Sequence, residues 1–382
     1  FGVAAFVFIT GLAQGYLREM VENSTGYVTG QLQVQHPRFR TEMEPANSLG
    51  NADSLLASVR RQPGVVAAAP RVQTMALASS AGQSQNFMLL GVDPSAEKEV
   101  TFMHRAVRTG RPLAPGGERD IVLGDRLAEK LAIRLGDKVV VMVQSLDGNV
   151  ASAAYRVVGL FDTGSDAFDA RLGYITLPAA QSLLGMTDRV STIAVRLAQI
   201  DQVQAAQASI AAVLPAGQAV ALGWRALLPE LDQMTEYLRV VLNLITGIVL
   251  SVVAIGVMNT LLMSVMERTR ELGIMMALGT RPRDIMLLVI YESLVLSLAG
   301  IAGGIALGAP FVHWLHVTGL DLSRYAKGLQ SIPGLTGIIH PIFVPATLVR
   351  PSLFLLVLSV LAALYPAWRA ARLQPTEAIR HA

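Results

Sequence analysis

The most constraining feature of this sequence is a short charged segment between two long uncharged segments. Residues 240–266 and 293–320 contain no charged side chain, and as helices both could cross a hydrocarbon core of about 30 Å. The intervening residues, 267–284, include seven charged side chains: Glu267, Arg268, Arg270, Glu271, Arg281, Arg283 and Asp284. Because a charge at mid-bilayer costs about 2.5–3.5 kcal/mol, we expect this segment at a membrane surface.

The charged segment also has the pattern of a short amphipathic helix. Leu272, Met275, Met276 and Leu278 recur among polar residues at helical spacing. Gly279 suits a helix C-terminus, and the following Arg281-Pro282 interrupts the pattern before the next helix. An ordinary interfacial helix between two spans is the alternative interpretation.

Residues 267–285, ERTRELGIMMALGTRPRDI, resemble the cytoplasmic loop of ABC transporter permeases of the MacB, FtsX and Lol type. In that family the loop is a coupling helix that docks in a groove of the ATPase subunit. The resemblance assigns ATPase coupling to Glu267, Arg268, Arg270, Glu271, Leu272, Met275, Met276, Gly279 and Arg281. Arg268 and Glu271 are the leading candidates, because flanking charges fix the register of an apolar helix face in a groove.

The composition supports a membrane protein. Apolar residues make up 52% of the chain and charged residues 15%, and the mean hydropathy is +0.47, whereas soluble domains are about 25% charged. The net charge of +3 comes without a basic run of five, and Arg gathers beside apolar segments. This pattern favours the positive-inside rule over nucleic-acid binding. The absence of Cys excludes disulfides and Cys-based metal sites.

Four membrane spans are predicted, at residues 1–17, 237–266, 285–316 and 351–368. Residues 1–17 read as a first span whose start precedes Phe1; the alternative is a signal peptide cleaved near Gly11-Leu12-Ala13. The loop 267–284 contains four Arg and the tail from Trp368 contains three. Both should therefore be cytoplasmic, and residues 18–236 and the loop 317–350 periplasmic. The tail 369–382, with the preceding YPAW, resembles the same permeases.

Residues 18–236 are predicted to form an α+β domain. Strand–helix–strand patterns at 27–92 and 190–222 suggest a split, ferredoxin-like α/β layer. They include strands at 27–35 and 192–197 and a helix at 52–61. The β-rich insertion at 93–185 includes a strand at 138–144 followed by Asp147-Gly148, a good hairpin turn. The layout resembles the MacB-like periplasmic core domain of the same permeases. The predicted fold class is an α-helical membrane protein with four transmembrane helices and this α+β extracytoplasmic domain.

No catalytic motif stands out. The sequence has no P-loop, no HExxH and no G-x-S-x-G, so we expect a non-catalytic subunit without a bound cofactor, and ATP and Mg in a partner ATPase. His313 and His316 are interpreted as interfacial anchors beside Trp314, with a metal site as the alternative.

Further candidates lie in the spans. Glu292, near the start of the third span, is either a functional acid or a snorkelling one. Gly300, Gly304 and Gly308 form a small-residue stripe for helix packing. Residues on the first two spans are candidates to line a cavity for lipid or cargo, or else face lipid or neighbouring helices: Phe6, Phe8, Ile9, Leu244, Ile248 and Val252.

The resemblance implies a permease subunit of the bacterial inner membrane that passes ATP-driven motion to its periplasmic domain, called mechanotransmission. Lipoprotein or lipid extraction is the preferred function. Export of a peptide or small molecule, as in MacB-type systems, and FtsX-like signalling to a periplasmic hydrolase are the alternatives. The implied partners are an ABC ATPase, a second permease copy or paralogue, membrane lipid and a periplasmic lipoprotein carrier; nucleic acid is not expected.

Overall fold

The computed structural model describes residues 2–321 and 338–372 of the 382-residue chain. Parts of the predicted loop 317–350 and of the predicted tail 369–382 therefore lie outside the described residues. The described chain divides into two compact units. We call residues 18–233 the α/β unit. Residues 2–17, 234–321 and 338–372 form the helical unit.

The α/β unit is built around one mixed sheet. Its strands are β1 (Leu32–Gln35), β2 (Val65–Ser79), β3 (Ser84–Val92), β4 (Val107–Gly110), β5 (Asp120–Gly124), β6 (Lys138–Gln144), β7 (Val150–Phe161), β8 (Leu172–Thr176), β9 (Thr192–Leu197) and β10 (Val220–Gly223). The helices are α2 (Ala52–Arg60), α3 (Pro94–Val100), α4 (Met103–Ala106), α5 (Asp125–Lys130), α6 (Asp166–Asp169), α7 (Leu177–Leu184), α8 (Val203–Ala211) and α9 (Trp224–Leu227), with a 3-10 turn η2 (Ile200–Gln202).

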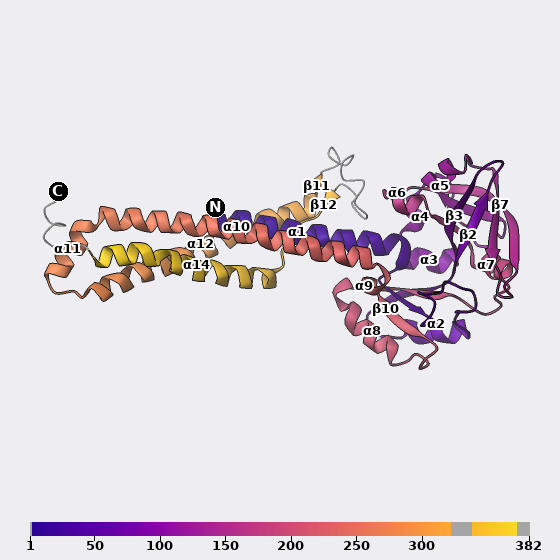
Figure 1. Cartoon of the computed structure of the whole chain (residues 1–382), viewed down its shortest axis with the longest axis horizontal. Helices are drawn as coiled ribbons and strands as arrows, with labels where there is room; N and C mark the ends of the chain where they lie inside the picture. Colours follow the sequence, from indigo (N-terminus) through magenta and orange to yellow (C-terminus); the bar gives the residue numbers. More distant parts are fainter. Residues whose placement is uncertain (1, 322–337, 373–382) are drawn as a thin grey trace. The chain divides into compact units, whose positions relative to one another are not determined.

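The long strand β2 belongs to two parts of this sheet (Figure 1). Its first half pairs with β9, and the order β10-β1-β9-β2 is antiparallel throughout. Its second half pairs with β3 on one side and β6 on the other. The order β2-β3-β8-β5-β7-β6 then returns to β2 and closes a ring, in which β3–β8 and β5–β7 are parallel.

The interior of this ring is the main apolar core of the unit. Along β6, Val139, Val141 and Val143 are buried while Lys138, Val140 and Gln144 are exposed. This alternation follows from the period of two in a strand. A ring closed in this way leaves few unpaired strand edges.

A buried ion pair lies where β2 passes from the first part of the sheet to the second. The Arg71 guanidinium donates to both Glu97 carboxylate oxygens, at 3.0 and 2.6 Å, and to the carbonyl oxygen of Val28 at 2.5 Å. The Thr101 hydroxyl also donates to Glu97, at 2.7 Å. Arg71 is 1% exposed. The pair joins β2, α3 and the chain segment that leads into β1.

Most predicted elements of the α/β unit are confirmed. Strands 138–144 and 192–197 have the predicted bounds, the helix predicted at 52–61 is α2, and Gly148 has a φ of +80° in the turn between β6 and β7. The strand predicted from Tyr27 is wrong at its start. Residues Thr25–Thr29 form a π-helical turn, η1, and β1 begins at Leu32.

The predicted boundary at residue 93 also differs from the structure. Strand β3 and the second half of β2, assigned to the first part of the domain, belong to the same ring as the strands of the insertion. The pairing that closes the ring joins β2 to β6, strands separated by many residues in sequence. Local alternation identifies a strand but does not identify its partner.

The helical unit contains long helices joined by one short one. They are α10 (Pro229–Glu267, which begins in the α/β unit), α11 (Thr269–Ala277), α12 (Pro282–Thr318) and α14 (Pro345–Ala371), with the small strands β11 (Leu320–Asp321) and β12 (Ile338–Ile339). Helix α1 (Gly2–Ser24) contributes its first residues to this unit. Among the described residues, three segments are long and apolar enough to cross a membrane: Pro229–Glu267, Pro282–Thr318 and Pro351–Ala371. Helix α1, which contains the predicted first span, is not one of the three.

Two apolar clusters hold the helical unit together. One joins α1, α10, α12 and α14 through Val7, Leu250, Val312 and Leu355 among others. The second joins α10, α11, α12 and α14 and includes the predicted coupling residue Leu272. The short helix α11 is therefore packed against the long helices of its own unit.

Candidate functional site

Helix α11 coincides with the amphipathic helix predicted inside residues 267–284. It starts after Arg268 and ends at Ala277. The amide of Thr280 donates to the carbonyl of Met275, and the amide of Gly279 donates to that of Met276, both at 3.0 Å. With a φ of +98° at Gly279, this is a Schellman ending, which glycine adopts without steric cost. The predicted C-terminal role of Gly279 is confirmed.

One face of α11 is buried within the helical unit. Leu272 is 2% exposed and packs with Val265 of α10 and Ile285 of α12. Gly273 is also buried, and Met276 packs partly against the same cluster. Leu272 was predicted to face an ATPase. The structure corrects this expectation, because the side chain fills the core of its own bundle.

The opposite face of α11 is open to contact. Met275, Glu267, Arg268, Arg270, Glu271, Gly279 and Arg281 are exposed. Two exposed apolar residues were not among the predicted site residues: Ile274, at 42% exposure, and Leu278, at 83%. Leu278 belongs to the predicted amphipathic pattern. The burial of Leu272 was needed to show which apolar residues of that pattern stay exposed and can contact a partner.

Arg268 and Glu271 form an ion pair on this open face. The Arg268 Nε atom donates to Glu271 Oε2 at 2.9 Å, and this hydrogen bond raises the pKa of Arg268 above its usual value. Both side chains are exposed, so the pair contributes little to folding. Its charges are free to contact a partner surface.

The six predicted cavity residues lie on α1 and α10, in different environments. Phe6 is buried in the core of the helical unit, and the ring of Phe8 packs against that of Phe311 at 5.6 Å. Ile9 is partly exposed on α1. Leu244, Ile248 and Val252 follow one exposed face of α10, at 57–63% exposure. Helix α1 packs on α10, where Val253 fits against Gly2. The role of the six residues as a cavity for lipid or cargo stays a prediction.

The glycine stripe on α12 is confirmed as a packing surface at two of its three positions. A Cβ atom built on Gly304 would lie 2.4 Å from the Val3 Cβ, and one on Gly308 would lie 2.9 Å from the Val7 Cβ. Helix α1 therefore approaches α12 more closely than larger residues permit. Gly300 has open space at the corresponding position.

The polar candidates within the spans have contacts inside the chain. The Ser264 hydroxyl donates to Glu292 Oε1 at 3.2 Å, which links α10 to α12. His316 Nδ1 lies 3.0 Å from the carbonyl oxygen of Pro341. Among the described residues, no group of three or more His, Asp or Glu side chains has an arrangement that suits a metal ion.

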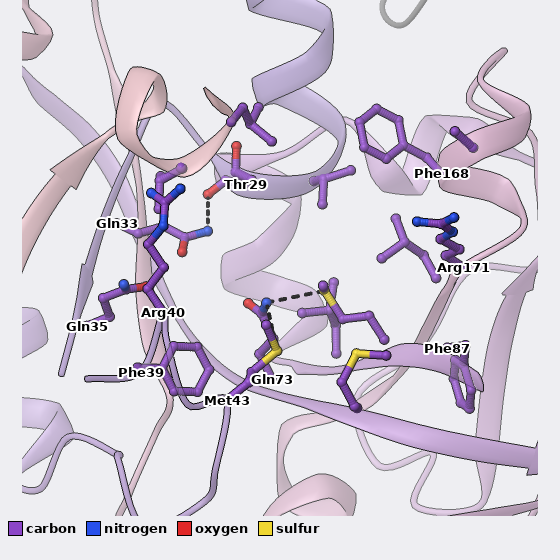
Figure 2. Close-up of a pocket in the computed structure, with 18 of the residues that line it drawn as sticks. Thr29, Gln33, Gln35, Phe39, Arg40, Met43, Gln73, Phe87, Phe168 and Arg171 are labelled. Carbon is purple, nitrogen blue, oxygen red and sulfur yellow. Dashed lines mark hydrogen bonds between the residues drawn. The ribbon is translucent and has the colours of Figure 1, made fainter. Parts of the chain in front are cut away.

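The α/β unit contains a cavity of about 590 Å³ that no sequence motif predicted (Figure 2). Its lining includes Gln33 and Gln35 of β1, Gln73 of β2, Met88 of β3 and Phe168 of α6. These residues are up to 135 positions apart in sequence, the difference between 33 and 168. No local pattern could have joined them.

Two family models match the chain. The MacB-like periplasmic core domain matches residues 1–213, and the FtsX-like permease C-terminal matches residues 243–375. The lipoprotein-releasing system transmembrane protein LolC of Neisseria meningitidis is 26% identical, over 100% of this chain and 91% of that protein. LolE of Haemophilus influenzae is 23% identical, over 99% and 91%. The macrolide export ATP-binding/permease protein MacB of Bordetella avium is 25% identical, over 99% and 56%.

These matches agree with the resemblance found in the charged loop and in the domain layout. The first family model alone spans more than half of the 382 residues. The second spans α11, α12 and the part of α10 from residue 243 onward. The chain belongs to the family of ABC transporter permeases that combine a MacB-like periplasmic core domain with an FtsX-like C-terminal region.

Proposed function

We propose that this chain is the transmembrane subunit through which a separate ABC ATPase drives release of lipoproteins or lipids from the bacterial inner membrane. The ATPase binds ATP and Mg, and this chain passes the motion on. The observation that supports this proposal most directly is that α11 has one buried face and one exposed face. Leu272 anchors one face in the helical unit, and the opposite face exposes Met275, Leu278 and the Arg268–Glu271 pair.

The connections of α11 suit the transfer of force. At its start, the amide of Arg268 donates to the carbonyl of Ser264, and that of Leu272 to the carbonyl of Arg268, so the chain turns from α10 into α11 without a long linker. At its end, the Schellman turn leads directly to Pro282, the first residue of α12. A displacement of α11 therefore acts on both long helices. An ATPase can drive it only through a contact that differs between its nucleotide states.

The membrane topology is part of the same proposal. Helix α1 is the fourth span, in addition to the three apolar segments, and is supported by its close packing on Gly304 and Gly308. The segment 267–284 and the tail are cytoplasmic, and residues 18–236 are periplasmic. The antiparallel order β10-β1-β9-β2, with α2 and α8 as connections, supports the ferredoxin-like description of that part of the sheet.

The cargo and the remaining partners are proposed from the relatives. Proteins named for lipoprotein release match this chain over nearly its whole length. We extend that cargo class to this chain, together with a second permease copy or paralogue and a periplasmic lipoprotein carrier. Export of a peptide or small molecule is the second candidate, because a relative named for macrolide export also covers 99% of the chain.

Copurification and a charge reversal test the proposal. The complete chain, coexpressed with a candidate ATPase encoded beside it, should copurify with that subunit. Glu271→Lys should weaken the association by at least about tenfold, because it places two cations side by side on the docking face. Membrane insertion should not change, since Glu271 is exposed.

The matched control is Glu118→Lys, the same charge change at an exposed position of the α/β unit. It should leave the association intact. Absence of any ATPase from a clean preparation would exclude the proposed function. Equal association of the Glu271→Lys and wild-type chains would remove Glu271 from the contact.

A further inference from the structure

Helix α10 exposes one carboxamide well inside its membrane-spanning segment. Asn259 lies among the uncharged residues 240–266, eight positions or about 12 Å along the helix from Glu267, the nearest charged residue in the sequence. Its side chain is exposed and makes no hydrogen bond to any described residue. Unlike Lys or Arg, asparagine is too short to reach the membrane surface from this depth. Facing hydrocarbon, the carboxamide would stay unpaired, which costs free energy.

The other exposed polar side chains of this segment are accounted for. The hydroxyls of Ser251 and Thr260 donate to carbonyl oxygens one turn earlier in α10, at 2.8 and 2.9 Å. Asn243 lies near the start of the uncharged segment, close to the membrane surface. On α12, the exposed residues between 294 and 312 have no polar side chain. Asn259 is therefore the exposed group that calls for a polar partner within the membrane.

The neighbours of Asn259 on this face follow a heptad repeat. Their spacings alternate between three and four residues, and every second position is seven residues further on. We call these positions the heptad stripe: Ile245, Ile248, Val252, Ile255, Asn259, Leu262 and Met266. Six of the seven are exposed, and Leu262 is partly exposed. A repeat of 3.5 residues keeps one helix face against a partner helix over its whole length.

The heptad stripe suits a second copy of this chain. Two copies insert in the same orientation, so their α10 helices are parallel, and each residue of the set Ile245, Val252, Asn259 and Met266 meets its own counterpart across a two-fold axis. A carboxamide has both donors and an acceptor, so two Asn259 side chains can pair with each other. A single Asn at such a core position fixes the register and the number of strands of a coiled coil.

We infer that the heptad stripe of α10 is an interface between two copies of this chain within the membrane, in which the two Asn259 carboxamides are hydrogen-bonded to each other. The inference rests on the second permease copy of the proposed function, and it assigns the surface through which that copy binds. Ile248 and Val252, which were predicted to line a cavity for cargo, then lie between the two copies. Because α10 leads directly into α11, a displacement of either α11 acts on the paired helices of both copies.

Cysteine cross-linking tests this interface. The 382 residues contain no Cys, so each introduced Cys reports on one position. Ile248→Cys, Val252→Cys and Ile255→Cys are made in the complete chain and oxidised in membranes with copper phenanthroline, and dimers are measured on non-reducing gels. We expect dimers from all three, because counterparts in a paired heptad stripe lie close enough for a disulfide. Val295→Cys of α12 is the matched control, at 64% exposure against 63% for Val252, and should stay monomeric.

Substitution of Asn259 in the Val252→Cys chain tests the polar contact itself. Asn259→Leu should raise the dissociation constant of the dimer about fivefold or more, the loss of one hydrogen bond within the membrane. The constant is measured from the cross-linked fraction as the chain is diluted in lipid. Asn259→Gln keeps a carboxamide and should retain most of the association. Thr260→Val is the control, because this hydroxyl is bonded within α10, and it should have no effect.

The melting temperature in detergent separates loss of the interface from loss of the fold. The Asn259 carboxamide has no partner among the described residues of its own chain, so Asn259→Leu should melt like its parent. A lower melting temperature would assign Asn259 to the fold of the single chain and overturn the inference.

Three other results would also overturn the inference. Val295→Cys could cross-link as efficiently as the heptad positions, Val252→Cys could cross-link to a polypeptide of different mass, which would place a paralogue on this face, or Asn259→Leu could associate like its parent. The cross-linking requires no ATPase. Its failure in a chain that copurifies with an ATPase removes this interface alone. Specific cross-linking in a chain that binds no ATPase removes the proposed coupling function and leaves the interface in place.

Discussion

The two units contain the same apolar residue types but expose them very differently. In the α/β unit, Ile121, Leu123 and Val139 are fully buried inside the ring of strands. In the helical unit, Leu244, Ile248 and Val252 are more than half exposed along α10. A contiguous apolar face of this length is not stable in water. The difference shows that one unit is folded for water and the other for hydrocarbon.

The largest expected effect comes from a charge placed on the exposed face of α10. Val252→Asp, near the middle of the uncharged residues 240–266, should oppose insertion by about 2.5–3.5 kcal/mol. The fraction of chain that resists alkaline extraction from membranes should fall. Val150→Asp is the control, because Val150 is 77% exposed in the α/β unit. Equal extraction of both variants would contradict the conclusion that the exposed face of α10 lies in hydrocarbon and the exposed surface of the α/β unit in water.

A smaller effect is expected when substitutions at a packed and an open glycine of α12 are compared. Gly304→Leu should destabilise the packing of α1 on α12 by about 1–3 kcal/mol, because its Cβ would overlap Val3. Gly300→Leu should have almost no effect, since its Cβ would meet open space. Thermal unfolding in detergent measures both. If the two variants have the same melting temperature, the glycine stripe is not a packing surface for α1.

A pH-dependent effect sharpens the description of the α/β unit as folded for water. Burial raises the pKa of Asp169 from its ordinary value near 3.8 to about 7, although the amide and hydroxyl of Thr163 donate to its carboxylate and oppose the shift. Between about pH 4 and pH 7 the folded chain retains a proton that the unfolded chain releases. The contribution of this group to stability therefore decreases as pH rises through that window.

Asp169→Asn removes this titration. Relative to the wild-type chain, the variant should gain melting temperature between pH 5 and pH 8. Asp147→Asn, exposed in the turn between β6 and β7, should show no such trend. A difference between wild type and Asp169→Asn that stays constant with pH would contradict the raised pKa.

The local elements of the fold could be predicted from the sequence, whereas their partners could not. Alternation defined β6, because its side chains have either an inner or an outer environment, whereas β9 is an apolar strand that is buried at nearly every position. The closing of the ring by β2 and β6 depends on pairing across distant segments. Thr25–Thr29 misled the prediction, because a π-helical turn has no distinctive pattern in side-chain type.

The candidate site shows the same limit. The charge pattern and Gly279 predicted the position and end of α11. Periodicity also showed that Leu272 and Met275 were apolar, but it could not show that the first packs inside the bundle and the second stays exposed. The cavity beside Gln35 depends on residues from several strands and helices, so it had no signal in the sequence at all.

The buried contact between Arg71 and Glu97 has a consequence for motion. The Arg71 guanidinium is hydrogen-bonded to Glu97 of α3 and to the carbonyl oxygen of Val28 in η1. Arg71 itself lies in β2, which runs through both parts of the sheet. Separating Arg71 from Glu97 would leave an unpaired charge in the protein interior, which is strongly disfavoured. We therefore expect a displacement of Val28 to move both parts of the sheet together, so that the α/β unit moves as one rigid body.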